Sequence, residues 1–283
     1  MNPCSHPLVL RLIDLALEED RVREDITCAL TIDNNAKGEA EIFVREELLL
    51  CGAPLISQIF VRLGWEVELY DLKSDGTMLK PNEHICRLRS RYRYLLSAER
   101  TILNFLMRLC AIASATHAIT SKYSSLEVCD TRKTTPGWRL LEKYAVRVGK
   151  GVNHRMNLAD MILVKNNHID ARAGDLKALL TELMAKKPAD IPVQVEVRNI
   201  DELRAAISFD PDFIMLDNFT ESEAEQALKI TRNCSLHSKI EISGGVTIER
   251  LDKLVSLGVK RVSLGALTHG AKSADIAMRV RSS

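Results

Sequence analysis

The sequence is poor in the features that mark membrane, secreted and nucleic-acid-binding proteins. It has no run of about 18 apolar residues, the length that a membrane-spanning helix needs. The first residues, MNPCSHPLVLRLIDLALEED, place acids within the apolar pattern and lack the basic-then-apolar order of a secretion signal. Formal net charge is only +1, so a site for a polyanion would have to come from local clustering of basic residues. These absences favour a cytoplasmic protein.

The seven cysteines lack the spacings of a metal site or a redox motif. They are scattered and odd in number, and none stands in a CxxC pair or a Cys/His zinc pattern. We therefore expect reduced, mostly structural thiols.

The composition that is present is typical of a soluble globular protein, with 283 residues, 46% apolar and 27% charged. The early part of the chain is mixed in pattern, with an amphipathic helix near residues 7 to 19 followed by short or alternating apolar stretches. We predict an N-terminal α+β sandwich domain over residues 1–108.

One predicted strand in this domain, Ile85 to Leu96, carries a row of arginines. The two-residue period of a strand separates its side chains into two faces. One face would hold Arg87, Arg89, Arg91 and Arg93, and the other Leu88, Tyr92 and Tyr94. Such a stripe is compatible with RNA binding. A solvated strand face that lines a shared anionic site is the favoured interpretation.

A long helix is predicted from Ser97 to Ser121, and after it strand-like runs alternate with helical ones. The six strand-like runs are LEVCD, MILVKN, VQVEVR, FIMLDN, KIEISG and RVSLGA. Strands that alternate with helices in this way are typical of parallel pairing with right-handed crossovers. We therefore predict an α/β fold in which residues 109–283 form an incomplete TIM-like barrel, whose last helix is free to pack back on the N-terminal domain.

Each of the six predicted strands ends in a polar or small residue. These residues are Asp130, Lys165, Glu196, Asp217, Ser243 and Gly265. In barrels of this class the functional residues lie at the carboxyl ends of the strands. One such residue is easily an ordinary helix cap, but six that converge at one face indicate a site.

The densest group of candidates lies between residues 130 and 169. Five of its basic residues are expected around the ends of the first two strands: Arg132, Lys133, His154, Arg155 and Lys165. Each alone is more typical of a solvated surface charge or a loop cap. Together they would share one concave site at a cost in mutual repulsion, which makes sense if the ligand is a polyanion.

Several strings in this part resemble the motifs of one enzyme family. They are DTRKTTPG, EKYAVRVG, GVNHRM, KNNHI, IMLDNF, SGGV and SLGALTH, preceded by SAERTILNFL. In order and separation they resemble the quinolinate phosphoribosyltransferase family, over roughly residues 20 to 275. The resemblance implies a carboxylating nicotinate-nucleotide pyrophosphorylase of de novo NAD biosynthesis. It would convert quinolinate and phosphoribosyl pyrophosphate to nicotinate mononucleotide, carbon dioxide and pyrophosphate.

The resemblance also implies which residues bind quinolinate. Arg132, His154, Arg155 and Lys165 would hold its two carboxylates, and Arg100 of the helix motif would reach the site of a neighbouring subunit. The active unit would then be a homodimer or a hexamer of dimers. Arginine suits this task because its guanidinium pairs with planar carboxylates through two hydrogen bonds.

The sugar donor would have its own residues by the same resemblance. Lys133 would face the departing pyrophosphate, and Glu196 and Asp217 would hold Mg²⁺ and the ribose hydroxyls. Magnesium commonly binds through one or two carboxylates plus substrate phosphates, although each acid is also compatible with an exposed cap. Backbone N–H groups of small residues approach a phosphate closely. The 5-phosphate cradle would comprise Ser243, Gly244, Gly245, Ser263, Leu264 and Gly265.

The implied reaction needs no protein nucleophile. The ring nitrogen of quinolinate would attack the sugar carbon as pyrophosphate leaves. The positive ring nitrogen would then stabilise the carbanion that remains when the 2-carboxylate departs as carbon dioxide. Two residues beside the site depart from the family pattern: Lys150 interrupts a glycine run, and Asn166 replaces an acid.

Two alternatives remain beside this interpretation. A pyridine phosphoribosyltransferase that acts on nicotinate without decarboxylation would leave part of the basic cluster unpaired. A non-catalytic protein that binds phosphorylated ligands or RNA would gain little from the two acids at strand ends. We expect neither nucleic acid nor a membrane as a partner.

Overall fold

The structure, a computed structural model, describes residues 3–232, 234 and 239–281. The chain divides into two compact units. Unit 1 comprises Met1–Ala118, Lys133–Gly151 and Ala266–Ser283, and unit 2 comprises Ile119–Arg132 and Val152–Gly265. Unit 1 thus takes in two segments that lie beyond the domain boundary predicted at residue 108.

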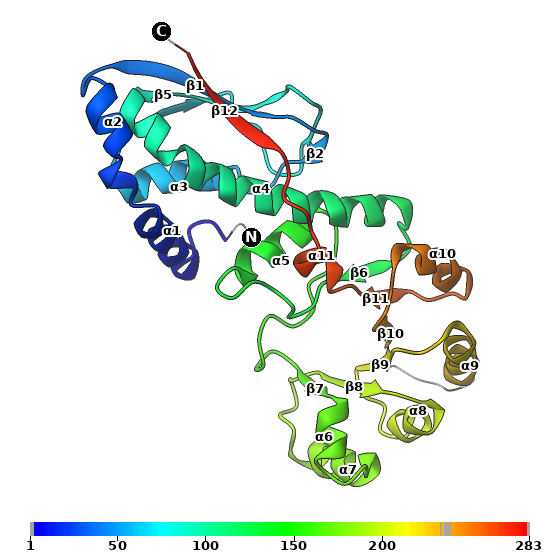
Figure 1. Cartoon of the computed structure of the whole chain (residues 1–283). Coiled ribbons are helices and arrows are strands. Elements are labelled where there is room, and N and C mark those ends of the chain that lie inside the picture. The colour runs from blue at the N-terminus through cyan, green and yellow to red at the C-terminus, as the bar shows by residue number, and fades with distance from the viewer. Residues whose placement is uncertain (1–2, 233, 235–238, 282–283) are drawn as a thin grey trace. The chain divides into compact units, whose positions relative to one another are not determined.

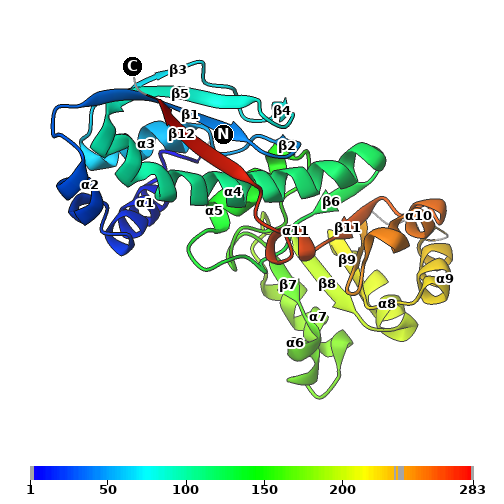
Figure 2. The same cartoon turned by 45° about the horizontal axis from the view of Figure 1, so that its top comes forward.

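Unit 1 is built on an antiparallel sheet in the order β12-β1-β5-β3. Its strands are β1 (Lys37–Val44), β3 (Glu68–Tyr70), β5 (His84–Arg91) and β12 (Ile276–Arg281), and β2 (Leu48–Leu49) pairs separately with β4 (Met78–Leu79). Figures 1 and 2 show β12, in red, beside β1, in blue. The last described element is therefore a strand that pairs with β1, and not the predicted helix.

Unit 1 also contains helices, which Figure 1 shows below this sheet. They are α1 (Pro7–Glu19), the 3-10 helix η1 (Val22–Glu24), α2 (Ile26–Thr31), α3 (Pro54–Leu63), most of α4 (Tyr92–Lys122), α5 (Arg139–Val148) and α11 (Ala266–His269). α1 has the predicted bounds. α5 lies between the first two parallel strands in the sequence, as predicted, and belongs to unit 1.

The predicted strand over residues 85 to 96 is too long. β5 ends at Arg91, and α4 begins at Tyr92, five residues before the predicted start. The helical start is held by side-chain contacts: Arg93 donates from Nε to the carbonyl of Ile32 at 2.8 Å, and Tyr94 stacks on Trp65 with ring centroids 4.4 Å apart. In the sequence, arginines continue to alternate with other residues past Arg91, so this pattern does not reveal that the strand ends there.

The arginines of β5 form ion pairs within the sheet. β1 places Glu41 opposite Arg87 and Glu39 opposite Arg89. Arg87 Nη1 lies 2.9 Å from Asp71, and Arg89 Nη2 lies 2.6 Å from Glu39. Cross-strand pairs of opposite charge stabilise a sheet. These pairs correct the interpretation of Arg87 and Arg89 as the lining of an anionic site.

α4 is the longest helix, with 31 residues, and by length and composition alone it could cross a membrane. However, 61% of its most apolar window is buried inside the protein. Leu103, Leu106 and Leu109 are at most 2% exposed. Such burial is typical of a core helix. In Figure 2, α4 runs along one side of the antiparallel sheet.

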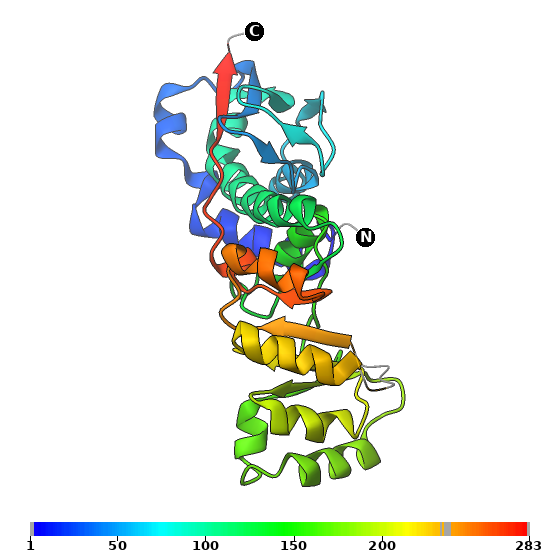
Figure 3. The ribbon, with the colours of Figure 1, turned by 90° about the vertical axis from the view of Figure 1, so that its right-hand side faces the viewer.

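Unit 2 is a six-stranded parallel sheet in the order β6-β11-β10-β9-β8-β7. Its strands are β6 (Glu127–Cys129), β7 (Ile162–Val164), β8 (Val193–Val197), β9 (Phe213–Asp217), β10 (Lys239–Ser243) and β11 (Arg261–Ser263). Its helices are α6 (Asn166–Asp170), α7 (Leu176–Lys186), α8 (Ile200–Ile207), α9 (Glu221–Arg232) and α10 (Ile248–Ser256), and Figure 3 shows α7 to α10 in order along one side of the sheet.

All six predicted strands are present and parallel, which confirms the α/β fold class. β6 and β7 are the two edges, and within the described residues no ladder joins them into a closed barrel.

The register of the parallel sheet places polar residues in successive layers. Ser243 pairs with Asp217, and Glu241 pairs with Met215, as does Glu196. Residues two apart on a strand share a face. Asp217 and Ser243 therefore form the layer at the carboxyl edge of the sheet, Glu196 and Glu241 lie one layer below, and Gln194 lies one layer below Glu196. Gln194 and Glu241 are fully buried and form a polar floor beneath the edge.

Candidate active site

Two acids lie at the carboxyl ends of neighbouring strands: Glu196 is the last residue but one of β8, and Asp217 is the last of β9. Glu196 is 9% exposed, and Asp217 is half-buried. Burial raises the pKa of Glu196, and the nearby charge of Asp217 raises it further, while Lys165 acts in the opposite direction. Within the described residues neither acid forms an ion pair. Two carboxylates held together in this way are stabilised by a cation or by hydroxyl donors.

Asn166 contacts both acids. Its Nδ2 lies 3.3 Å from Asp217 Oδ2, and its backbone N–H donates to Glu196. Asn218 Nδ2 is a second donor to Asp217, at 3.0 Å. The remaining side-chain atom, Asn166 Oδ1, is buried and has no hydrogen-bond partner in the part of the chain that is described. Asn166 therefore belongs to the acidic site and does not merely flank it.

Two arginines lie close together in unit 2. The pKa of Arg155 is lowered, mainly by burial and then by the neighbouring charge of Arg132. Arg155 Nη1 donates to the carbonyl of Met161 at 3.0 Å. Arg132 Nε is buried without a partner among residues 3–232, 234 and 239–281. Neither guanidinium pairs with a described carboxylate, so both charges remain for an anionic ligand.

Three other predicted cations have separate surroundings. Lys165 is exposed before α6, and its backbone N–H donates to His168 Nδ1 at 2.9 Å. Lys133 is exposed in unit 1, where its carbonyl accepts the hydroxyl of Thr268 at 2.7 Å. Arg100 is exposed on α4 of unit 1, beside a hollow of about 540 Å³. The candidate residues are thus divided between the units.

His154 is buried in unit 2. Its ring Nδ1 accepts the backbone N–H of Arg155 at 2.8 Å, and its Nε2 lies 2.7 Å from Gln194 Oε1. Its own backbone N–H donates to Asp130 at 2.9 Å. Asp130 is fully buried and also accepts from Asn153 Nδ2 at 2.6 Å. The segment around His154 is therefore fixed by short polar contacts.

The buried floor contains an ion pair that the sequence analysis does not identify. Arg261 donates to Glu241 at 2.8 Å and to Glu127 at 2.6 Å. The hydroxyl of Ser263 also donates to Glu241, and the backbone N–H of Leu264 donates to the carbonyl of Cys129 at 2.9 Å. These two groups, predicted for the phosphate cradle, are already used within the chain.

Gln194 and Glu241 were also missed as candidates. The signal that could have found them is the two-residue period, because each stands two positions before a strand-end residue that was selected.

The loop after β10 is shaped by glycines. Gly244 and Gly245 have φ angles of 77° and 56°, in the left-handed region that glycine tolerates. A Cβ on Gly244 would lie 2.4 Å from Asn218 Oδ1. Arg250 donates to the carbonyl of Gly245 at 2.8 Å and so holds the loop before α10. This close backbone approach suits the predicted phosphate cradle.

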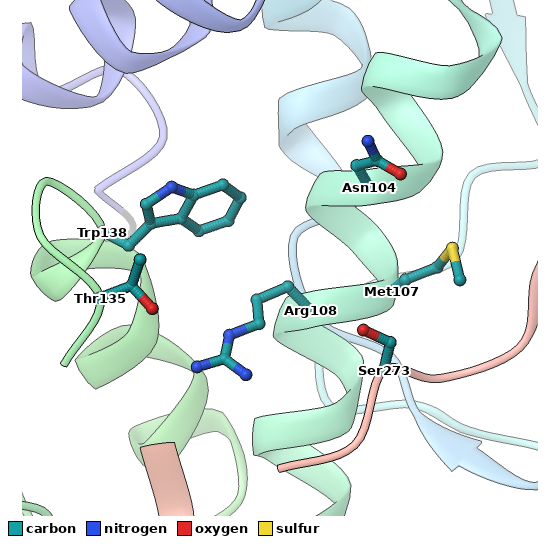
Figure 4. Close-up of a pocket in the computed structure, with 6 residues that line it drawn as sticks. All are labelled: Asn104, Met107, Arg108, Thr135, Trp138 and Ser273. Atoms are coloured by element: carbon teal, nitrogen blue, oxygen red, sulfur yellow. The ribbon is translucent and has the colours of Figure 1, made fainter. Parts of the chain in front are cut away.

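A hollow of about 340 Å³ lies within unit 1. It is lined by Asn104, Met107, Arg108, Thr135, Trp138 and Ser273 (Figure 4). The charge of Arg108 is already paired, since its Nη2 lies 2.7 Å from Glu142 and 2.6 Å from the carbonyl of Thr268. Glu142 also accepts the hydroxyl of Thr135 at 2.9 Å. This pair therefore fixes the segment that follows Lys133.

Comparisons with known proteins cover nearly the whole chain. The family model for the N-terminal domain of quinolinate phosphoribosyl transferase matches residues 25–110, and that for its C-terminal domain matches residues 112–279. A probable nicotinate-nucleotide pyrophosphorylase (carboxylating) of Bacillus subtilis is 38% identical over 278 residues, which cover 98% of this chain and 94% of that protein.

A plant relative and a solved structure agree with this match. The chloroplastic nicotinate-nucleotide pyrophosphorylase (carboxylating) of Oryza sativa is 32% identical over 98% of this chain and 80% of its own length. The crystal structure of NadC from Streptococcus pyogenes has a TM-score of 0.91 and 34% identity, over 100% of this chain and 99% of that one. The chain belongs to the quinolinate phosphoribosyltransferase family.

Proposed function

We propose that the carboxyl edge of unit 2 binds the substrates of the family reaction. In this reaction quinolinate and phosphoribosyl pyrophosphate give nicotinate mononucleotide, carbon dioxide and pyrophosphate. The observation that carries the proposal is the separation of charge at this edge. Arg132 and Arg155 lie together and form no ion pair with a described carboxylate, and Glu196 and Asp217 lie together and form no ion pair with a described cation.

The arginine side of the edge suits quinolinate. Its two adjacent carboxylates need two planar donors, and a guanidinium supplies paired N–H groups in a fixed geometry. Arg132 and Arg155 hold these carboxylates, with Lys165 as a third cation. A monocarboxylate would leave one arginine unpaired in a partly buried position, which is costly. Nicotinate is therefore the poorer substrate.

The acidic side suits magnesium and the ribose. Carboxylate and amide oxygens are the ligands that Mg²⁺ prefers, usually one or two from the protein and the rest from phosphates and water. Glu196, Asp217 and Asn166 Oδ1 offer such oxygens. Among the described residues no set of three or more His, Cys, Asp or Glu could hold a metal alone. A magnesium ion at this site would therefore take its other ligands from the substrate phosphates and water. When bound, the ion would neutralise charge on the pyrophosphate.

The residues of the chain contribute positioning and electrostatics. Lys133 stabilises the negative charge that develops on pyrophosphate as its bond to the sugar carbon breaks, and the arginines hold the ring nitrogen in line with that carbon. After the bond forms, the positive ring nitrogen stabilises the electron pair that the departing carbon dioxide leaves on the adjacent ring carbon, and this carbon then takes up a proton. The loop at Gly244 and Gly245 holds the 5-phosphate.

The proposal is tested by release of labelled carbon dioxide from carboxyl-labelled quinolinate in the presence of the sugar donor and Mg²⁺. Release that requires all three components supports it, and nicotinate should give no product at equal concentration. Lys133→Ala should lower kcat by roughly 10²–10³ while quinolinate still binds. Lys187→Ala, a lysine whose ammonium contacts backbone carbonyls of unit 2, is the matched control. Unchanged turnover in Lys133→Ala would remove this lysine from the mechanism.

The active unit that we propose is a dimer in which Arg100 completes the site of a partner subunit. The support is the exposure of Arg100 on α4 and the family resemblance of its motif. Arg100→Ala and Glu196→Gln should each be inactive alone. If Arg100 acts across subunits, mixing the two unfolded variants and refolding them together restores about a quarter of the activity, because half of the dimers then carry one intact site. No recovery would place Arg100 in its own subunit's site.

The alternative of RNA binding has less support. The row of arginines on β5 suggested RNA binding, but two of them, Arg87 and Arg89, form ion pairs with acids of unit 1. A binding titration with single-stranded RNA at two salt concentrations tests it, and tight RNA binding without turnover would favour it over catalysis. We also place the enzyme in the cytoplasm, because all seven cysteines are free thiols, as is usual in a reducing compartment.

A further inference from the structure

The contacts of His154 define where its proton lies. A backbone N–H can only donate, so Nδ1, which accepts the N–H of Arg155 at 2.8 Å, carries no proton. The proton of the neutral ring is therefore on Nε2, which lies 2.7 Å from Gln194 Oε1. Both ring nitrogens are used inside the chain, and the residue is only 8% exposed. In this state the ring has no N–H left to offer to a substrate carboxylate.

Gln194 is held in one orientation by this contact. It is completely buried on β8, one layer below Glu196. Its Oε1 must face His154, because the reverse orientation would place an amide N–H against the ring N–H. The amide Nε2 then has no acceptor among the described residues. A buried unpaired donor is destabilising, so its retention indicates that the contact of Oε1 has a use.

The charged groups around His154 explain why an amide stands at position 194. Glu241 Oε1 from β10 lies 3.8 Å from the same Nε2, and its charge is balanced by Arg261 from β11. Asp130 accepts the backbone N–H of His154. A glutamate at 194 would add a carboxylate with no cation of its own, and the ring would take a second proton. That proton would go to Nδ1 and break the contact with Arg155.

We propose that Gln194 is a positioning residue that keeps His154 in its neutral Nε2–H form, so that His154 serves the quinolinate pocket by fixing Arg155 and not by binding the carboxylates itself. This inference rests on the proposed function of that pocket. A neutral ring also avoids a third positive charge beside Arg132 and Arg155, which already repel each other. The residue that touches the substrate is Arg155, and Gln194 acts on it through His154.

The first test is spectroscopic and needs no turnover. Protein with ¹⁵N-labelled histidine is measured by two-bond ¹H–¹⁵N correlation at neutral pH, with the His154 signals assigned from the His154→Asn spectrum. The wild type should show an unprotonated Nδ1 and a protonated Nε2. Gln194→Glu should show a doubly protonated ring, and Gln194→Met, which keeps the size but has no acceptor, should lose the single tautomer. Gln226→Glu, on the exposed face of α9, should leave the signals unchanged.

The second test separates binding from turnover. Gln194→Met should raise KM for quinolinate roughly tenfold or more, as supporting contacts of binding residues commonly do, and leave KM for the sugar donor near that of the wild type. A wild-type ring that is doubly protonated or carries its proton on Nδ1 overturns the proposal, as does an unchanged tautomer in Gln194→Met. If the purified chain releases no carbon dioxide from quinolinate, the proposed function fails while the spectroscopic result still decides the role of Gln194.

Discussion

The antiparallel sheet of unit 1 and the carboxyl edge of unit 2 treat charge in opposite ways. Arg89 on β5 lies within ion-pair distance of Glu39 and Glu68. At the edge of unit 2, the strongest charged neighbour of Arg155 is Arg132 and that of Glu196 is Asp217, and neither residue forms an ion pair among the described residues. The charges of the sheet are neutralised by ion pairs within the chain, whereas the charges at the edge are left for a ligand. A row of basic residues in a sequence does not distinguish these two cases.

The largest expected difference between the two regions is in activity. Glu196→Gln removes one charge of the acidic pair and should lower kcat by about 10²–10³. Arg89→Ala breaks two exposed ion pairs and should leave kcat within about twofold, because exposed pairs contribute little. Steady-state rates with quinolinate measure both. Equal losses in the two variants would break the distinction between paired and unpaired charges.

A paired charge that is buried should instead affect stability. Glu142 is fully buried and holds both Arg108 and Thr135. Glu142→Leu leaves the partly buried guanidinium without its carboxylate and should lower the free energy of unfolding by about 3–5 kcal/mol. Glu142→Gln keeps an acceptor and should lose less. Urea unfolding measures both, and similar losses would show that the charge itself does not matter here.

Glu196, for which we propose a role in catalysis, should also destabilise the fold at neutral pH. Burial and Asp217 raise the pKa of Glu196, so the folded protein keeps this proton to a higher pH than the unfolded chain. Stability from this group therefore falls as pH rises from its ordinary pKa through the raised one, and the loss is complete above both. Glu196→Gln should raise the Tm at pH 7.5 but not at pH 4. A Tm gain that is equal at the two pH values would contradict this.

The smallest expected effect concerns the backbone at the end of α5. Lys150 has a φ angle of 66°, in the left-handed region, at the position where helices commonly end in glycine. Lys150→Gly should stabilise unit 1 by about 1 kcal/mol by relieving this strain. Lys150→Ala keeps the strain and removes only the charge, so it serves as the control. A gain in Lys150→Ala equal to that in Lys150→Gly, measured by urea unfolding, would assign the effect to charge.

The sequence predicted the parallel strands well because each is a short apolar run that ends in a polar residue. It failed where the pattern carried no boundary, as at Arg91, where a strand continues directly into a helix. It also failed to find β12, since the partner of that strand lies at the other end of the chain and periodicity is a local signal.

Only the site residues at the ends of strands could be predicted from the sequence. Glu196 and Asp217 were selected because they close strands, whereas Gln194 and Glu241 stand inside apolar runs and were read as strand interior. Ser263 and Leu264 were assigned by motif, but their hydroxyl and N–H are directed into the fold. Hydrogen-bond direction is not written in a sequence, and this limited what could be predicted about individual roles.

The pairing of β1 with β12 bears on how the protein is made. Val44 lies opposite Ile276, and Glu39 lies opposite Arg281. During synthesis the first of these strands leaves the ribosome long before the second, and at about 5–20 residues per second the wait lasts many seconds. Throughout that interval β1 presents an unpaired edge that another nascent chain could join. Unit 2, whose strands are contiguous in sequence between residues 119 and 265 except for one excursion, has no comparable delay.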